Sequence, residues 1–312
     1  MKYALGMDIG GTRTKMGLVD LEKGTVVRKA VYSTEKEEAG FLEAALYHKN
    51  ECIKEVKPEE LLGIGAAASG YVHRGGRIDE GNSGFIPFFP SYPLEEKLGE
   101  CLGMTCKVEN DAAAGCLGEA LYGAGKNYKR VLMLTLGTGV GVGFIRNGHI
   151  DDESSLIHLS GHIKVSGNPE EGGMRCYCGI SGCLESVCSG TALEWKAAQA
   201  YGRPVSCKEL FAQAEHNEEK AGKLAADYLN MLAAGLNQYI YIFAPDVIIL
   251  GGGVAHALGG YTAVLQEQVT AKVHSRYKVL VTLSELKEEA GILGGASLVT
   301  VHSVHSSLRK SI

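Results

Sequence analysis

Two short glycine-rich turns, each set between residues typical of β-strands, constrain this chain more than any other feature of its sequence. They read DIGGT at residues 8–12 and GTGVG at residues 137–141. A dinucleotide-binding fingerprint or a Walker loop has to open a helix, so neither class fits these turns. A glycine hairpin between strands can still present backbone N–H groups to phosphate oxygens. The pair predicts a clasp around one triphosphate, although either turn could be only a tight connection.

Residues in and beside these turns complete a predicted nucleotide site. The hydroxyl groups of Thr12 and Thr138 add hydrogen-bond donors. Asp8 ends the first strand, where it could hold Mg²⁺ through water or simply cap its own turn. A third glycine cluster, at residues 251–253, follows a buried strand and would let an adenine ring approach bare backbone. The predicted cofactor-binding residues are Asp8, Gly10, Gly11, Thr12, Lys15, Gly137, Thr138, Gly139, Gly251, Gly252 and Gly253.

Strand-like and helix-like stretches alternate along the chain and predict an α/β fold. Helices are expected at residues 35–57, 191–202, 218–243 and 262–275. A capping box of Thr191 and Glu194 would open the second of these helices. At 312 residues the chain has room for two domains of roughly 150 residues each. We expect one domain from residues 1–115 plus 290–312 and a second from residues 116–289.

Asn110 and Asp111 stand at the predicted junction of a strand and an alanine-rich helix. Asn110 fits the N-cap position. The positive end of the helix dipole would keep Asp111 anionic near neutral pH, ready to accept a proton from an attacking hydroxyl group. Phosphoryl transfer needs mainly positioning and charge stabilisation, so one carboxylate can suffice. The alternative is that both residues only cap the helix.

A dense group of thiols and one imidazole predicts a zinc site. His162 is followed by CYCGISGC, which supplies Cys176, Cys178 and Cys183. Three thiolates and one imidazole complete a tetrahedral Zn²⁺ site and leave no position for a catalytic water, so the zinc would be structural. The alternative is a set of free buried thiols. The other six cysteines show no ligand spacing and are expected in the core.

The charge balance disfavours nucleic acid as a partner. The formal net charge is −5 and the pI is about 6.1, so the chain has no basic excess to neutralise a phosphate backbone. A small-molecule ligand is expected instead. The N-terminal apolar stretch is too short and too soon charged for a signal peptide, and the odd number of cysteines does not suggest disulfides. A cytoplasmic protein without membrane contact is expected.

Together these motifs resemble the ROK family of sugar kinases and sugar-responsive repressors. The stretches that carry the resemblance occur in the family's order and cover nearly the whole chain: DIGGT, VENDAAAGCLGEALYG, LTLGTGVGVG, CYCGISGCLES and VIILGGGV. The resemblance implies an actin-like ATPase architecture, with two RNase H-like domains and a cleft between them. It also implies ATP with Mg²⁺, a structural zinc, and a homodimer or homotetramer. Asp111 would then be the base that acts on a hexose hydroxyl group, usually that on C6.

The resemblance further implies a set of sugar-binding residues. They are Gly70, Asn82, Asn110, Asp111, His162 and Glu185. Two departures from the family pattern lie nearby: Ser69-Gly70 replaces the usual Pro-Gly, and Leu159 stands in place of a sugar-binding Glu. Losing that acceptor removes a contact on the C1 or C2 side of the sugar, at a cost of about 1–3 kcal/mol. The preferred sugar, or the rate, would then differ from that of an ordinary glucokinase.

These features predict an ATP-dependent hexose kinase that acts on the 6-hydroxyl group of glucose or a related aldohexose. Two alternatives share the fold: an allose or N-acetylhexosamine kinase, and a catalytically degenerate sugar-binding regulator. Repressors of the family carry an N-terminal helix-turn-helix domain, whereas the first phosphate motif here begins at residue 8. DNA binding is therefore not expected.

Overall fold

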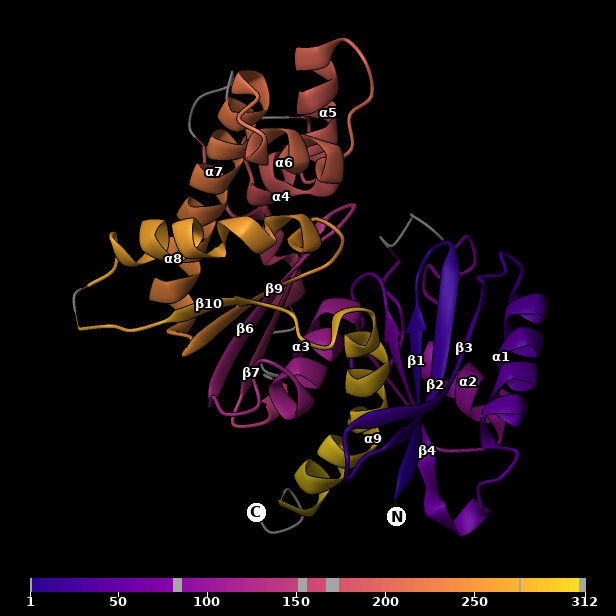
Figure 1. Ribbon diagram of the computed structural model, residues 1–312. Helices are drawn as coiled ribbons and strands as arrows, with labels where there is room; N and C mark the ends of the chain where they lie inside the picture. The colour runs from indigo at the N-terminus through magenta and orange to yellow at the C-terminus, as the bar shows by residue number, and fades with distance from the viewer. Residues whose placement is uncertain (1, 81–85, 151–155, 167–173, 275, 309–312) are drawn as a thin grey trace. The chain divides into compact units, whose positions relative to one another are not determined.

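In the computed structural model the described residues are 2–80, 86–150, 156–166, 174–274 and 276–308. They fall into two compact units (Figure 1). Unit 1 comprises Met1–Lys126, Gly148–His158 and Glu288–Ile312, and unit 2 comprises Asn127–Asn147 and Leu159–Lys287. The described residues form two five-stranded sheets with helices, which confirms the α/β class. The domain limits drawn from the sequence stay a prediction.

The first sheet belongs to unit 1 and has the strand order β3-β2-β1-β4-β5. Strands β1, β2 and β3 form an antiparallel meander, while β4 pairs in parallel with β1 and β5. The elements of this unit are β1 (Tyr3–Ile9), β2 (Arg13–Asp20), β3 (Thr25–Ser33), α1 (Glu38–Ile53), η1 (Pro58–Glu60), β4 (Leu61–Ala68), α2 (Leu94–Leu102), β5 (Cys106–Asn110), α3 (Asp111–Tyr122) and α9 (Ala290–Leu308).

The alternation of side chains along β1 assigns the two faces of the first sheet to different helices. Leu5 and Met7 are buried in the hydrophobic core together with side chains of α1 and α2. On the other face Gly6 leaves room for α9, because a Cβ there would overlap the carbonyl group of Ile292. Figure 1 shows α9 lying along this sheet beside α3. Asp8 shares the face of Gly6, and its carboxylate therefore lies against the first turn of α9.

The second sheet has the strand order β10-β9-β6-β7-β8. Strands β6 and β7 form an antiparallel hairpin, and β9 pairs in parallel with β6 and β10. The strand, glycine turn and strand that open unit 1 are thus repeated, as predicted. The remaining elements are β6 (Arg130–Leu136), β7 (Val140–Arg146), β8 (His149–Ile150), η2 (Ile157–His162), α4 (Leu184–Cys188), α5 (Gly190–Tyr201), α6 (Cys207–Glu215), α7 (Glu219–Phe243), β9 (Val247–Gly251), η3 (Ala255–Tyr261), α8 (Thr262–Thr270), β10 (Leu280–Leu283) and η4 (Lys287–Glu289).

Several helix ends differ from the prediction, and α1 spans only Glu38–Ile53 of the helix expected at residues 35–57. The capping box at Thr191 and Glu194 is wrong, because the N-cap of α5 is Ser189, whose hydroxyl group accepts a backbone hydrogen bond from the first turn. The helix starts earlier in the chain than predicted, and the hydroxyl group of Thr191 donates instead to the carbonyl oxygen of Thr138 at 2.9 Å. Helix α8 also ends earlier than predicted, at Thr270.

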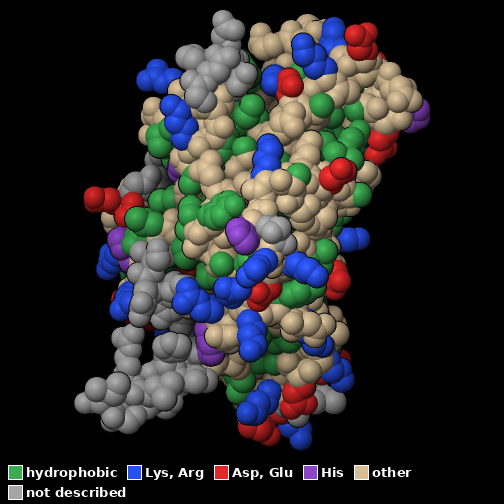
Figure 2. All heavy atoms as spheres, turned by 90° about the vertical axis from the view of Figure 1, so that its left-hand side faces the viewer, with side chains coloured by type: hydrophobic (Ala, Val, Ile, Leu, Met, Phe, Trp, Pro, Cys, Tyr) green, Lys and Arg blue, Asp and Glu red, His purple; other side chains and the backbone are tan. Residues whose placement is uncertain are grey.

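The surface carries charges of both signs. Figure 2 shows Lys and Arg side chains interspersed with Asp, Glu and hydrophobic side chains on one face of the molecule. This mixture agrees with the small net charge of the sequence. Within the described ranges, no helix combines the length and the apolar character that crossing a bilayer requires.

Candidate functional site

Asp111 is the first residue of α3 and follows directly from β5, so its carboxylate stands at the end of a strand in the first sheet. Asn110 caps the helix: its Oδ1 accepts hydrogen bonds from the backbone N–H groups of Ala112 at 2.9 Å and Ala113 at 3.2 Å. The predicted N-cap is confirmed. Because Asn110 takes this position, Oδ2 of Asp111 reaches a neighbouring loop instead of the cap.

That loop follows β4 and holds both residues of the Asn110–Asp111 pair. The hydroxyl group of Ser69 donates to Oδ2 of Asp111 at 2.7 Å. The side-chain amide of Asn110 donates to the carbonyl oxygen of Gly70 at 2.9 Å. Gly70 has a φ of 99°, which favours glycine. The structure thus brings three predicted sugar-binding residues together and adds Ser69, which the sequence had marked only as a departure from the family pattern.

Burial raises the pKa of the Asp111 carboxyl group above its usual range. The hydrogen bond from Ser69 opposes this change, and the negative charge of Asp8 adds to it. The helix dipole alone predicts the opposite change, a lowered pKa. That prediction is corrected, because loss of water around a partly buried carboxylate is the larger effect. A carboxylate with a raised pKa is better suited to act as a base near neutral pH.

Asp8 lies near the end of β1, beside the first glycine turn. The Nζ atom of Lys15 is 3.4 Å from its carboxylate and 3.9 Å from that of Glu288. Burial raises the pKa of Asp8, and the positive charge of Lys15 opposes this change. Two predicted nucleotide-binding residues, Asp8 and Lys15, are therefore in contact, and the effect of Asp8 on Asp111 places the two acids in one part of unit 1.

Hydrogen bonds from unit 1 hold the DIGGT turn in shape. The hydroxyl group of Thr34 donates to the carbonyl oxygen of Gly10 at 2.7 Å, and its N–H donates to that of Thr12 at 3.0 Å. The ammonium group of Lys36 donates to the carbonyl oxygen of Gly11. The carbonyl groups of all three turn residues are thus bound within their own unit.

The GTGVG turn is held by residues at the starts of α4 and α5. The backbone N–H of Gly190 donates to the carbonyl oxygen of Gly137 at 2.7 Å. The N–H of Val140 donates to Oε2 of Glu185 at 3.1 Å. A Cβ at Gly139 would lie only 2.7 Å from the same Oε2, so the carboxylate needs a glycine there. Glu185, predicted as a sugar contact, therefore lies directly against a predicted phosphate-binding turn.

The third glycine cluster packs against the strand that leads into this turn. Gly252 has a φ of +85°, and a Cβ at this position would lie 2.5 Å from the carbonyl oxygen of Leu136. The N–H of Val254 donates to the same oxygen at 3.0 Å. By contrast, a Cβ at Gly253 would meet open space. The predicted adenine-binding glycines are thus placed beside the GTGVG hairpin within unit 2.

Four side chains of unit 2 place their ligand atoms within 4.8 Å of one another: His162, Cys176, Cys178 and Cys183. The His162 Nδ1 atom is 3.6 Å from Sγ of Cys176 and 3.9 Å from Sγ of Cys183. Zinc bonds of about 2.3 Å to sulfur and 2.0 Å to nitrogen separate tetrahedral ligands by roughly 3.5–3.8 Å. Donor set and spacing therefore fit zinc. The other ring nitrogen of His162 lies 2.8 Å from the hydroxyl group of Tyr177, which orients the ring.

Comparison with known proteins identifies the family. The sequence model of the ROK family matches residues 4–302. The chain belongs to the ROK family. A glucokinase from Thermotoga maritima is 33% identical to this ROK protein over 316 residues, which cover 95% of this chain and 96% of the relative. The resemblance drawn from the sequence motifs is confirmed.

Two solved structures are similar to this ROK protein. A ROK hexokinase from Thermus thermophilus is 32% identical, with a TM-score of 0.83 over 97% of this chain and 99% of the other. A ROK family glucokinase from Streptomyces griseus, in complex with glucose and AMPPNP, is 26% identical, with a TM-score of 0.76 over 95% and 98% of the two chains. The predicted actin-like ATPase fold with two RNase H-like domains is thereby confirmed, while the cleft between the domains stays a prediction.

Two further positions were singled out in the sequence of this ROK protein, Asn82 and Leu159. Asn82, a predicted sugar contact, lies outside the described residues. The side chain of Leu159, which replaces the family's glutamate, is 36% exposed. The roles of the predicted catalytic, sugar-binding, cofactor-binding and metal-binding residues stay predictions.

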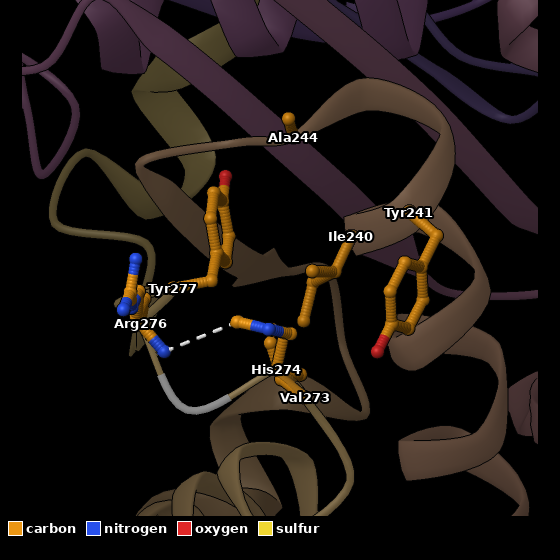
Figure 3. Close-up of a pocket in the computed structure, with 7 residues that line it drawn as sticks. All are labelled: Ile240, Tyr241, Ala244, Val273, His274, Arg276 and Tyr277. Carbon is orange, nitrogen blue, oxygen red and sulfur yellow. Dashed lines mark hydrogen bonds between the residues drawn. The ribbon is translucent and has the colours of Figure 1, made fainter.

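A pocket of about 370 Å³ lies at the C-terminal end of α7 (Figure 3). Its lining residues are Ile240, Tyr241, Ala244, Val273, His274, Arg276 and Tyr277. The hydroxyl group of Tyr277 donates to the carbonyl oxygen of Pro245 at 2.6 Å, and the N–H of Arg276 donates to Nδ1 of His274 at 3.4 Å. These lining residues include none of the predicted site, so the predicted chemistry of the ROK protein does not depend on this pocket.

Proposed function

We propose that this ROK protein transfers the γ-phosphoryl group of ATP to a hydroxyl group of a hexose, namely glucose or a related aldohexose. The observation that carries the proposal is the setting of Asp111, a partly buried carboxylate that is hydrogen-bonded to Ser69 and lies in the field of Asp8. Support comes from the glucokinase relative and from the similar glucokinase structure with bound glucose and AMPPNP, an analogue of ATP.

Asp111 is the general base in this reaction. Its carboxylate accepts the proton of the sugar hydroxyl group as that oxygen forms a bond to the γ-phosphorus. The bond from the γ-phosphorus to the bridging oxygen breaks, and ADP leaves with the electron pair. Asn110 joins the first turn of α3 to the carbonyl group of Gly70, which keeps the base in place during proton transfer.

The two glycine turns bind the phosphate groups of ATP through backbone N–H groups and the hydroxyl groups of Thr12 and Thr138. A bound Mg²⁺ supplies positive charge to the phosphate oxygens. Asp8 fits such an ion, because its buried carboxylate is an oxygen ligand of the kind Mg²⁺ prefers and is close enough to raise the pKa of Asp111. Lys15 adds a second positive charge beside it.

The proposed sugar contacts are Gly70, Asn110, Asp111, His162 and Glu185. His162, Cys176, Cys178 and Cys183 would hold a structural zinc, which would stabilise the segment before α4. The side chain of Leu159 has no hydrogen-bond acceptor, so the preferred sugar forms no hydrogen bond with the side chain of residue 159.

A coupled assay of ADP release tests the proposal. Mg-ATP is offered with glucose, mannose, fructose, allose, N-acetylglucosamine or N-acetylmannosamine. We expect turnover of at least one sugar and a loss of about 100-fold or more in Asp111→Asn, as for removal of a general base. Asp227→Asn is the matched control, since this partly exposed residue of α7 pairs only with Lys196 among its described ion pairs. Silence across the panel, with sugar binding still measured by calorimetry, would favour the degenerate regulator.

A further inference from the structure

Two hydrogen-bond donors fix the plane of the Asp111 carboxylate, one on each oxygen. The backbone N–H of Ala112, which is shared with Oδ1 of Asn110, donates to Oδ1 of Asp111 at 2.8 Å, and the hydroxyl group of Ser69 donates to Oδ2 at 2.7 Å. An ionised carboxylate has about four lone-pair positions, so these two donors leave room for a substrate hydroxyl group. Free rotation about the last side-chain bond would otherwise turn the oxygens away from that group.

The Ser69 hydroxyl group is itself held in position by its loop. The next residue, Gly70, accepts a hydrogen bond from the side chain of Asn110, which also caps α3. Hydrogen bonds therefore connect the loop after β4, the N-cap residue Asn110 and the base Asp111. Proline, which the family pattern has in place of Ser69, carries no hydroxyl group, so this hydrogen bond depends on the particular sequence of this chain.

We propose that Ser69 is a positioning residue for the phosphoryl transfer, holding the carboxylate of Asp111 in its reactive orientation through the hydrogen bond to Oδ2. The inference rests on the proposed kinase function. The hydrogen bond from Ser69 also affects the ionisation of Asp111. The charged group that acts on Asp111 is Asp8, which is itself paired with Lys15 and near Glu288, and its negative charge disfavours ionisation of the base. The Ser69 hydroxyl group stabilises the ionised form against this charge.

The pH profile of kcat separates this role from a purely structural one. Ser69→Ala should move the acidic limb of the profile to higher pH by about one pH unit, roughly a tenfold loss of rate below the pKa of the base. The KM for the sugar should change much less. Ser69→Thr, which keeps the hydroxyl group, should restore most of the wild-type profile. Ser297→Ala is the matched control, because this buried hydroxyl group of unit 1 donates to the carbonyl oxygen of Leu293 and not to an acid.

A second readout does not need turnover. Aspartate labelled with ¹³C at the carboxyl carbon allows the Asp111 signal to be assigned by its loss in Asp111→Asn and to be titrated by NMR in the unliganded protein. Ser69→Ala should raise that titration midpoint, and Ser69→Thr should not. An active enzyme whose profile and titration are unmoved by Ser69→Ala overturns the positioning role while the kinase function stands. Wild-type protein silent with every sugar overturns the function, and an unmoved midpoint then overturns the role of Ser69 as well.

Discussion

The carboxylate of Glu185 lies between the GTGVG turn and the predicted zinc ligand Cys176. Its Oε2 accepts a hydrogen bond from the N–H of Val140 at 3.1 Å, and its Oε1 is 3.6 Å from Sγ of Cys176. Helix α4, which carries Glu185, begins directly after Cys183. A single side chain therefore connects a predicted phosphate-binding turn to a predicted zinc site, and a change at either one should reach the other.

Replacement of Glu185 should weaken the binding of both substrates. Glu185→Ala removes the partner of the Val140 N–H, and a lost hydrogen bond to a charged group is worth about 1.5–3 kcal/mol, so KM for ATP should rise about tenfold or more. Glu185→Gln keeps an oxygen for Val140 and should raise this KM less. Steady-state kinetics with each substrate varied in turn check this. Glu267→Gln, on the exposed side of α8, is the control; an unchanged KM in Glu185→Ala contradicts the prediction.

Zinc should be bound at one ion per chain and should stabilise unit 2. Mass spectrometry of the metal content checks the stoichiometry. Cys178→Ser should lower both the zinc content and the Tm, the latter by about 5 °C or more, because structural zinc contributes directly to folding. Cys101→Ser, which changes a partly exposed thiol outside the cluster, should leave the zinc content unchanged. If wild-type protein contains no zinc and has the same Tm as the Cys178→Ser variant, the four residues do not form a zinc site.

Gly252 and Gly253 should respond oppositely to the addition of one methyl group. At Gly252 the backbone is left-handed and a Cβ would lie 2.5 Å from the carbonyl oxygen of Leu136, so Gly252→Ala should lower the free energy of unfolding by at least about 1–3 kcal/mol. Gly253→Ala is the matched control, since a Cβ there meets open space. Urea unfolding of both variants measures the difference. Equal stabilities would contradict the close packing of Gly252 on the hairpin.

Local signals in the sequence were enough to predict much of the local geometry around the candidate site residues. Glycine turns between strands, the N-cap at Asn110 and the spacing of Cys176, Cys178 and Cys183 each depend on neighbours close in the chain, and the structure places all of them as expected. The N-cap of α5 was missed because two hydroxyl residues, Ser189 and Thr191, both suit that position. The bond from Thr191 to a distant turn decided between them.

Features that depend on distant parts of the chain could not be predicted. Ser69 and Asp111 are 42 residues apart, and no local pattern links them. Burial and the negative charge of Asp8 raise the pKa of Asp111, and both effects exist only once the first sheet has formed. The sequence motifs drew attention to glycines in turns, whereas Gly6 lies within a strand and allows α9 to pack on the sheet. The Ser69–Asp111 hydrogen bond, the raised pKa of Asp111 and the close packing at Gly6 all depend on tertiary packing.

Asp111 should lower the stability of the unliganded protein at neutral pH. Burial raises its pKa in the folded state above the value of about 3.9 for a free aspartate, so the folded state binds the proton more tightly than the unfolded state. The free energy of unfolding therefore falls as the pH rises through this range and stays lower above it. Asp111→Asn does not titrate, and it should be more stable than wild type near neutral pH.

This advantage of Asp111→Asn should shrink as the pH falls toward about 4, where the aspartate becomes protonated in both states. Urea unfolding of the two proteins across this pH range measures it, with Asp227→Asn as the control whose difference from wild type should not follow the same course. An advantage that is absent at neutral pH, or that does not change with pH, would contradict a raised pKa. The expected result would show that the unliganded site retains a charge that burial disfavours, because the carboxylate is positioned for a reaction and not for the stability of the fold.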